Sequence, residues 1–207
     1  MVRARDDRRA ASGPPALMVH IVPMRRRHLR SVLRIEAETH PRPWSLSLFM
    51  SELALRTSRA YYVARVDGLV VGYVGLMMSA DEGHITTIAV DPNWQRRRIA
   101  TRLLLVAVNE AIRRGGRALT LEVRMSNRAA QELYRAFGFR PAGVRKNYYV
   151  ESNEDALVMW AEDVDVPDYR LRLEAIEAAV PGETVVEPER GAGPERPSER
   201  NGTPPRP

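Results

Sequence analysis

Apolar and polar residues alternate along most of this chain with two different periods, and the order of these periods predicts a mixed α/β fold. Leu29, Val32, Leu33 and Ile35 recur at helical spacing, which is typical of a helix that buries one face. Short apolar runs between turn residues predict strands instead. Strands are expected at His20–Val22, Ala60–Val66, Leu69–Ser79, His84–Val90, Ala118–Val123, Ala142–Val150 and Ala156–Ala161. Helices are expected at Met24–Thr39, Leu46–Leu55, Ile99–Arg114, Asn127–Phe137 and Asp168–Ala179.

Local signals at the ends of these elements agree with the assignment. Ser45 stands where a helix N-cap is expected, and Asp67-Gly68 is a strong hairpin turn between two strand patterns. Pro41 and Pro43 favour an extended loop, and Gly115-Gly116 ends a helix. The order of elements predicts an α/β fold with a mixed central sheet of about six to seven strands, flanked by four helices, with an extra C-terminal helix.

The two ends of the chain differ from its middle in composition. Residues 1–18 mix arginine, aspartate, alanine, glycine and proline without a period, and residues 181–207 hold seven of the fifteen prolines. Such segments cannot bury enough apolar surface to offset their ordering entropy. We therefore expect a disordered arm at 1–18, one globular domain at 19–163, an accessory helix in 164–180 and a disordered tail at 181–207.

Composition excludes several classes of protein. The 207 residues are 44% hydrophobic, enough for one core, and include no cysteine, which rules out disulfides, zinc thiolate sites and a cysteine nucleophile. We find no apolar run of about 18 residues and no apolar core of a secretory signal, so a cytoplasmic protein without a membrane span is expected. The histidines show no metal-ligand spacing. The formal charge of +6 favours anionic partners.

The most informative stretch is a strand, a tight turn and a helix in direct succession. Ile85–Val90 predicts a buried strand, Asp91–Trp94 ends it, and an amphipathic helix opens at Gln95–Ala100. The first N–H groups of a helix lack an intrahelical partner, and the helix dipole adds partial positive charge there. A phosphate-bearing ligand is therefore expected, the more so because arginines cluster at this end of the helix, namely Arg96, Arg97, Arg98 and Arg102.

The same stretch resembles a known family. Gln95-x-x-Arg98-x-Ala100 resembles the Q/R-x-x-G-x-G/A pyrophosphate loop of the GNAT N-acetyltransferases. Further motifs follow in the family's order, and over about residues 19–163 the chain resembles the RimI-type enzymes within that family. These motifs are His40–Ser45, Leu121–Ala130, Leu133–Phe139, Arg145–Tyr149 and Glu154–Met159.

The resemblance implies the GNAT fold and acetyl-CoA as co-substrate, without a metal. Backbone N–H groups of the loop would hold the pyrophosphate, and strand backbone would hold the pantetheine arm. The family favours glycine at the position of Arg98, where arginine adds bulk and positive charge. Asn127 is both a family cofactor contact and a candidate N-cap. The implied cofactor-binding residues are Ile88, Ala89, Val90, Gln95, Arg96, Arg97, Arg98, Ile99, Ala100, Thr101, Asn127 and Tyr134.

Acetyl transfer to an amine needs a proton acceptor for the amine and a proton donor for the leaving thiolate. By resemblance Glu122 occupies the general-base position and Tyr134 the general-acid position. From the residues alone, Glu122 is equally a solvated strand carboxylate and Tyr134 a helix residue that packs on the core, so these alternatives stay open.

The resemblance also implies a peptide site. Pro43, Trp44 and Ser45 match the loop that closes over the substrate, and Tyr148 and Tyr149 match a segment that lines it. The alternatives are that Trp44 anchors the core and that one of the two tyrosines is buried in it. No role is assigned to His20, His28, His40 or His84.

The function implied is transfer of acetyl from acetyl-CoA to the N-terminal α-amine of a protein, with alanine preferred and a small-subunit ribosomal protein as the leading acceptor. Such an enzyme is expected to be a monomer or weak dimer that binds neither nucleic acid nor membrane directly. Two alternatives stay open. The acceptor could be a lysine side chain or a small amine, or the domain could be a non-catalytic module that binds a ligand or the ribosome.

Overall fold

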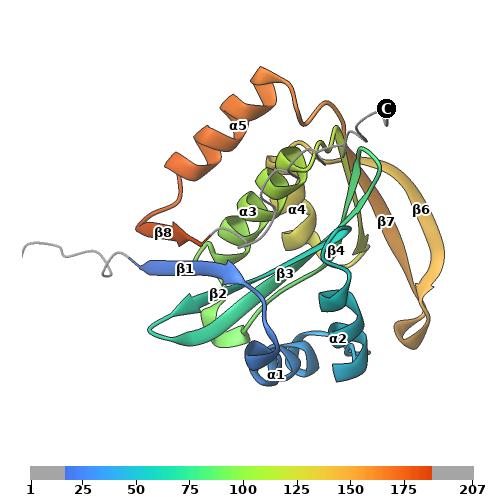
Figure 1. Ribbon diagram of the computed structural model, residues 1–207. Coiled ribbons are helices and arrows are strands. Elements are labelled where there is room, and N and C mark those ends of the chain that lie inside the picture. Colours follow the sequence, from blue (N-terminus) through green and yellow to red (C-terminus); the bar gives the residue numbers. More distant parts are fainter. Residues whose placement is uncertain (1–16, 188–207) are drawn as a thin grey trace, which may run out of the picture.

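The computed structural model describes residues 17–187, which form a mixed sheet with helices on both faces (Figure 1). Most of the expected N-terminal arm (1–18) and of the expected tail (181–207) lies outside these residues. The strands are β1 (Met18–Pro23), β2 (Arg59–Val66), β3 (Leu69–Ser79), β4 (Glu82–Val90), β5 (Ala118–Arg124), β6 (Arg140–Tyr149), β7 (Glu154–Ala161) and β8 (Glu183–Val186). The helices are α1 (Leu29–Thr39), α2 (Leu46–Ala54), α3 (Ile99–Arg113), α4 (Arg128–Ala136) and α5 (Pro167–Ala178).

Every expected helix and strand is present, with small shifts at the ends. The largest shift is at the first helix, which was expected from Met24 but begins at Leu29 after a short 3₁₀ turn, Arg26–His28. The helix N-caps form as expected. The Ser45 hydroxyl accepts from the backbone N–H of Leu48 at 3.2 Å.

The strands follow the order β6-β7-β5-β4-β3-β2-β1-β8. The β4–β5 and β1–β8 pairs are parallel and the other pairs are antiparallel. The helices α1 and α2 cover one face of the sheet, and α3, α4 and α5 lie on the other (Figure 1). Two apolar clusters result, one around Phe49 and Ile35 under α1 and α2, the other around Leu103 and Phe137 under α3 and α4. No helix among residues 17–187 is both long and apolar enough to cross a bilayer.

The sheet has eight strands, not about six to seven, because the expectation of a disordered tail from residue 181 is wrong for its first residues. Glu183–Val186 forms β8 and pairs with β1, Val19 opposite Thr184. Gly182 makes this approach possible. Its φ is +87°, and a Cβ there would collide with the backbone of Leu17.

The strands β4 and β5 separate along their length, and the candidate site lies where they separate. They pair only from Glu82 opposite Ala118 to His84 opposite Thr120, although β4 runs on to Val90 and β5 to Arg124. Beyond His84 the edge of β4 that faces β5 therefore makes no ladder within the described residues. Such an edge can accept an extended ligand as an added strand.

Candidate active site

The turn between β4 and α3 is held by its own side chains. The Asp91 carboxylate accepts from the Asn93 N–H at 2.9 Å and from the Arg34 guanidinium at 2.7 Å. Hydrogen bonds from these two residues outweigh the effect of burial and hold the pKa of Asp91 below its usual value. The Gln95 side-chain amide donates to the Val90 carbonyl at 3.4 Å. Gln95 therefore ties the loop to the end of β4.

The loop itself adopts a conformation that explains why the motif favours glycine. Arg96 and Arg98 lie in the left-handed region with φ of 62° and 60°, where a residue with a Cβ is strained by about 1 kcal/mol or more. Arg98 is the N-cap of α3, but its side chain makes no capping hydrogen bond. The first N–H groups of α3, at Ile99, Ala100 and Thr101, are thus left to a ligand.

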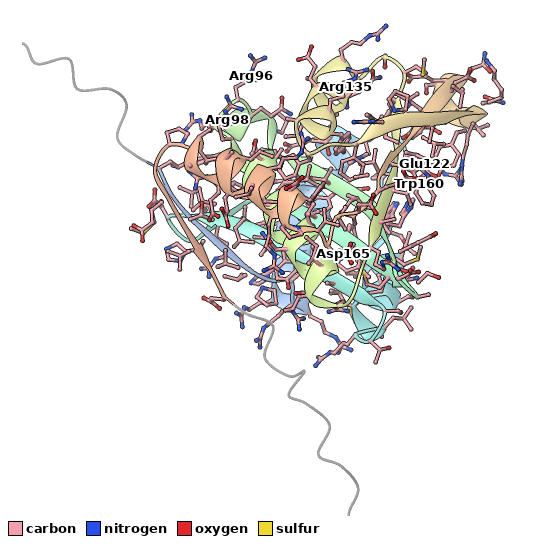
Figure 2. All side chains as sticks on the ribbon, turned by 90° about the horizontal axis from the view of Figure 1, so that it is seen from above. Arg96, Arg98, Glu122, Arg135, Trp160 and Asp165 are labelled. Carbon is pink, nitrogen blue, oxygen red and sulfur yellow. The ribbon has the colours of Figure 1, made fainter. Side chains whose placement is uncertain are left out.

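The four arginines do not act together as the sequence suggested. Arg96 and Arg98 are exposed and project from the turn before α3 (Figure 2). Arg97 lies over the Trp94 ring, with its guanidinium carbon 4.8 Å from the ring centroid. Arg102 is 1% exposed and donates to the Pro181 carbonyl and the Thr184 hydroxyl. The expectation that Arg102 joins the anion site is therefore wrong, because it points into the contact with β8.

Glu122 lies on β5 just past the point where β4 and β5 separate, and it is flanked by two basic side chains. Its Oε2 is 3.1 Å from His84 Nε2, and its Oε1 is 3.1 Å from Arg145 Nη2. The Glu122 side chain is only 6% exposed. The hydrogen bond from His84, with the charge of Arg145, holds the pKa of Glu122 below its usual value. Glu122 is therefore an ionised, nearly buried carboxylate.

Tyrosines complete the site. Tyr148 and Tyr149 meet edge to face on β6, with ring centroids 5.2 Å apart. Burial raises the pKa of Tyr149 to about 12, and the charge of Glu122 contributes to the rise. Tyr134 of α4 is 5% exposed, and burial raises its pKa, with a contribution from Tyr149. Glu122 and Tyr134 thus lie within electrostatic range of the same phenol, and Tyr134 stays protonated at neutral pH.

Comparison with known proteins agrees with this geometry. Residues 29–139 match the model of the acetyltransferase (GNAT) family. The chain belongs to this family.

Named relatives within the GNAT family are RimI-type enzymes. The chain is 39% identical to the putative [ribosomal protein bS18]-alanine N-acetyltransferase of Bacillus subtilis, over 66% of this chain and 91% of the relative. It is 41% identical to the N-alpha-acetyltransferase RimI of Mycobacterium tuberculosis, over 59% of this chain and 78% of the relative. Among solved structures, the chain is similar to the ribosomal-protein-S18-alanine N-acetyltransferase of Escherichia coli, with a TM-score of 0.65 and 33% identity. The match covers 70% of this chain and 94% of that structure.

The residues that the GNAT resemblance assigns to the peptide site lie in the loop before α2 and at the end of β6. The Trp44 ring packs 5.3 Å from the Phe49 ring, so Trp44 does contact the core, while Pro43 and Ser45 are exposed. Glu36 of α1, 1% exposed, accepts from the Trp44 N–H at 3.0 Å and fixes this loop. Tyr148 is 45% exposed, which suits a wall of an open site.

Most of the cofactor residues expected from the GNAT resemblance fall along the free edge of β4 and at the start of α3, while Asn127 and Tyr134 lie at α4. Ala89 and Val90 are buried and Ile88 is half-buried, so only their backbone is available to a ligand. The Asn127 side chain accepts from the Ala130 N–H at 3.1 Å and is the N-cap of α4.

Two residues of this site have no individual role in the sequence patterns. A lone histidine on a strand, such as His84, belongs to no motif, and Arg145 stands within a family segment without a role of its own. The sole signal in the sequence was that His84 and Glu122 both lie on strands expected next to the anion loop. Their contact depends on the parallel register of β4 and β5, which the sequence does not encode locally.

Proposed function

We propose that this acetyltransferase transfers acetyl from acetyl-CoA to the α-amine of a protein N-terminus that begins with alanine, in the cytoplasm, where ribosomal proteins are made. The leading acceptor is ribosomal protein S18 of the small subunit, since the relatives from Bacillus subtilis and Escherichia coli carry this acceptor in their names. The observation that carries the proposal is the ionised, 6% exposed Glu122, which lies within electrostatic range of Tyr148 and Tyr149 at the point where β4 and β5 separate.

The chain offers two adjoining places for the cofactor. The free N–H groups at the start of α3, with the exposed Arg96 and Arg98, suit a pyrophosphate. The free edge of β4 suits the amide groups of an extended pantetheine arm, which would bring the thioester toward Glu122 and Tyr134. Bound there, acetyl-CoA supplies the activated acetyl group.

The remaining chemistry belongs to side chains. The Glu122 carboxylate attracts the cationic N-terminus and accepts a hydrogen bond from it, which orients the nitrogen. The Tyr134 phenol, protonated because burial raises its pKa, is the proton donor for the thiolate that leaves. By the family resemblance, the Trp44 loop and Tyr148 would border the first side chain of the substrate, which favours a residue as small as alanine.

Mass spectrometry of protein N-termini from cells with and without this protein tests the proposal. We expect the S18 N-terminus to be acetylated only when the protein is present. An S18 N-terminus acetylated to the same extent in both cell lines would contradict the proposed acceptor. Gain of acetyl-lysine without any change at N-termini would favour a lysine acceptor instead.

A further inference from the structure

His84 contacts Glu122 closely, and of these two residues the family motifs include only Glu122. His84 occupies the last position at which β4 pairs with β5, opposite Thr120. From there its Nε2 meets Glu122 Oε2 at 3.1 Å, with side-chain exposures of 24% for His84 and 6% for Glu122. The pair thus bridges the two strands at the point where they separate.

The contact defines where one proton lies. An ionised carboxylate oxygen is only an acceptor, so a nitrogen 3.1 Å away must carry a hydrogen for the contact to be attractive. Nε2 of His84 therefore holds a proton, and in the neutral ring Nδ1 is the free base. Among the described residues, no hydrogen bond to this Nδ1 is present. The arrangement is that of an imidazole oriented by a buried carboxylate.

Glu122 alone is a weak acceptor for the proton of an α-ammonium group. Free α-amino groups titrate near pH ~7.7–8.0, whereas the pKa of Glu122 lies below 4.5 because His84 and Arg145 stabilise its charge. Transfer of the proton from the ammonium group to this carboxylate is therefore unfavourable. An imidazole, which ordinarily titrates near pH ~6.5, is far better matched to this amine.

We propose that His84 is the proton acceptor of the reaction, with Glu122 as the carboxylate that orients it and binds the ammonium group. The proposal rests on the proposed function, because it names the residue that activates the α-amine. The amine transfers a proton to Nδ1 of His84, directly or through one water molecule, and the imidazolium formed is stabilised by Glu122 Oε2.

The proton balance closes with the residues already described. An α-ammonium group loses two protons as it becomes an amide. The first goes to His84 and from there to solvent, which the partly exposed ring can reach. The neutral nitrogen then forms its bond to the acetyl carbon as the carbon–sulfur bond breaks. The second proton ends on the sulfur, by way of Tyr134.

The charged and titratable groups around the pair lie on β6. Arg145 is bound to Glu122 Oε1, and Tyr148 and Tyr149 sense the charge of Glu122. Both phenols have a raised pKa and stay neutral below about pH 10. The two tyrosines therefore do not accept the proton of the ammonium group near neutral pH.

The test is the pH profile of kcat/KM in a His84→Gln variant, with an alanine-start peptide. Glutamine retains an N–H that can donate to Glu122 but cannot take a proton. We expect a loss of roughly 10²-fold at pH 7, shrinking to a few-fold near pH 9.5, where the peptide amine is already neutral. The KM for acetyl-CoA should not change. The matched control, His20→Gln on β1, should keep the wild-type profile.

A second variant distinguishes the loss of the proton acceptor from a loss of folded structure. In His84→Ala, added imidazole should restore a large part of the rate at pH 7, and should not do so in Glu122→Ala. A loss in His84→Gln that is equal at every pH, or an unchanged profile, would overturn the proposal. If the wild-type protein acetylates only lysine side chains, the proposed function fails, but the same pH test on that amine still decides the role of His84.

Discussion

Arg102, in the first turns of α3, donates hydrogen bonds from its guanidinium to the Thr184 hydroxyl of β8 and to the Pro181 carbonyl beside it. The residue is 1% exposed, and burial lowers its pKa. The helix whose N-terminus suits the cofactor pyrophosphate is thus tied to a strand that lies 82 residues further along the chain.

A chain that ends at residue 180 should therefore be unstable. It loses β8 and leaves the buried Arg102 guanidinium without either acceptor, which costs about 3 kcal/mol or more. A chain that ends at residue 187 retains both. We expect urea denaturation to give a much lower unfolding free energy for the shorter chain. Arg102→Met should recover part of that loss in the shorter chain, and equal stability of the two truncated chains would contradict this account.

Replacing Arg98 by glycine should stabilise the protein. Its φ of 60° is strained for arginine and free for glycine, which predicts a gain of about 1 kcal/mol in unfolding free energy. Arg97→Gly is the matched control, since Arg97 does not have a positive φ, and should destabilise. Calorimetric titration with acetyl-CoA then separates the roles of Arg98. Binding that weakens in the stabilised variant shows that the guanidinium charge contributes to affinity.

Arg145 should compete with the substrate. Its Nη2 lies 3.1 Å from Glu122 Oε1, the oxygen left to an incoming ammonium group. The side chain is 57% exposed, so the pair is weak and readily displaced. Arg145→Gln should lower the peptide KM a few-fold. Lys146→Gln removes the same charge from the next residue, which is bound to Asp155 at 2.7 Å, and should leave KM unchanged. A higher KM in Arg145→Gln would show that Arg145 helps to bind the peptide.

Glu110 of α3 should contribute stability that disappears in acid. Burial favours its neutral form, but hydrogen bonds from Arg113 and Arg114 outweigh this effect and hold the pKa below 4.5. Because the folded pKa is lowered, the stabilisation is present above pH 4.5 and lost as pH falls through the folded value. Glu110→Gln should cost roughly 1–3 kcal/mol of unfolding free energy at pH 7, and this cost should shrink as the pH falls below 4.5. Exposed Glu132→Gln is the control. A difference in unfolding free energy between wild type and Glu110→Gln that does not change with pH would contradict this account.

The sequence predicts those parts of the fold whose causes are local. The hairpin at Asp67-Gly68 and the caps at Ser45 and Asn127 form within a few residues, so their signals can be read directly from the chain. Glu122 was located because it belongs to a motif. By contrast, β8 has only four residues, too few to show a strand period, and it forms a strand because the edge of β1 is available to pair with it.

Residues whose role depends on distant partners escaped sequence reasoning. Arg102 looked like part of the anion cluster until the helix was placed against residues 181–184. His84 gained its importance only from the parallel register that sets it opposite Thr120 and within reach of Glu122. The glycine-like backbone at Arg98 was also not foreseen, since the arginine side chain gives no hint of a positive φ.

The most direct test of the central claim is acetyl transfer to a peptide that begins with alanine and contains one internal lysine. Tandem mass spectrometry of the product locates the acetyl group. We predict acetylation at the α-amine alone, no product from the same peptide with a blocked α-amine, and a loss of roughly 10²-fold in Glu122→Gln. Equal acetylation of the blocked peptide at its lysine would contradict the assignment of this site to protein N-termini.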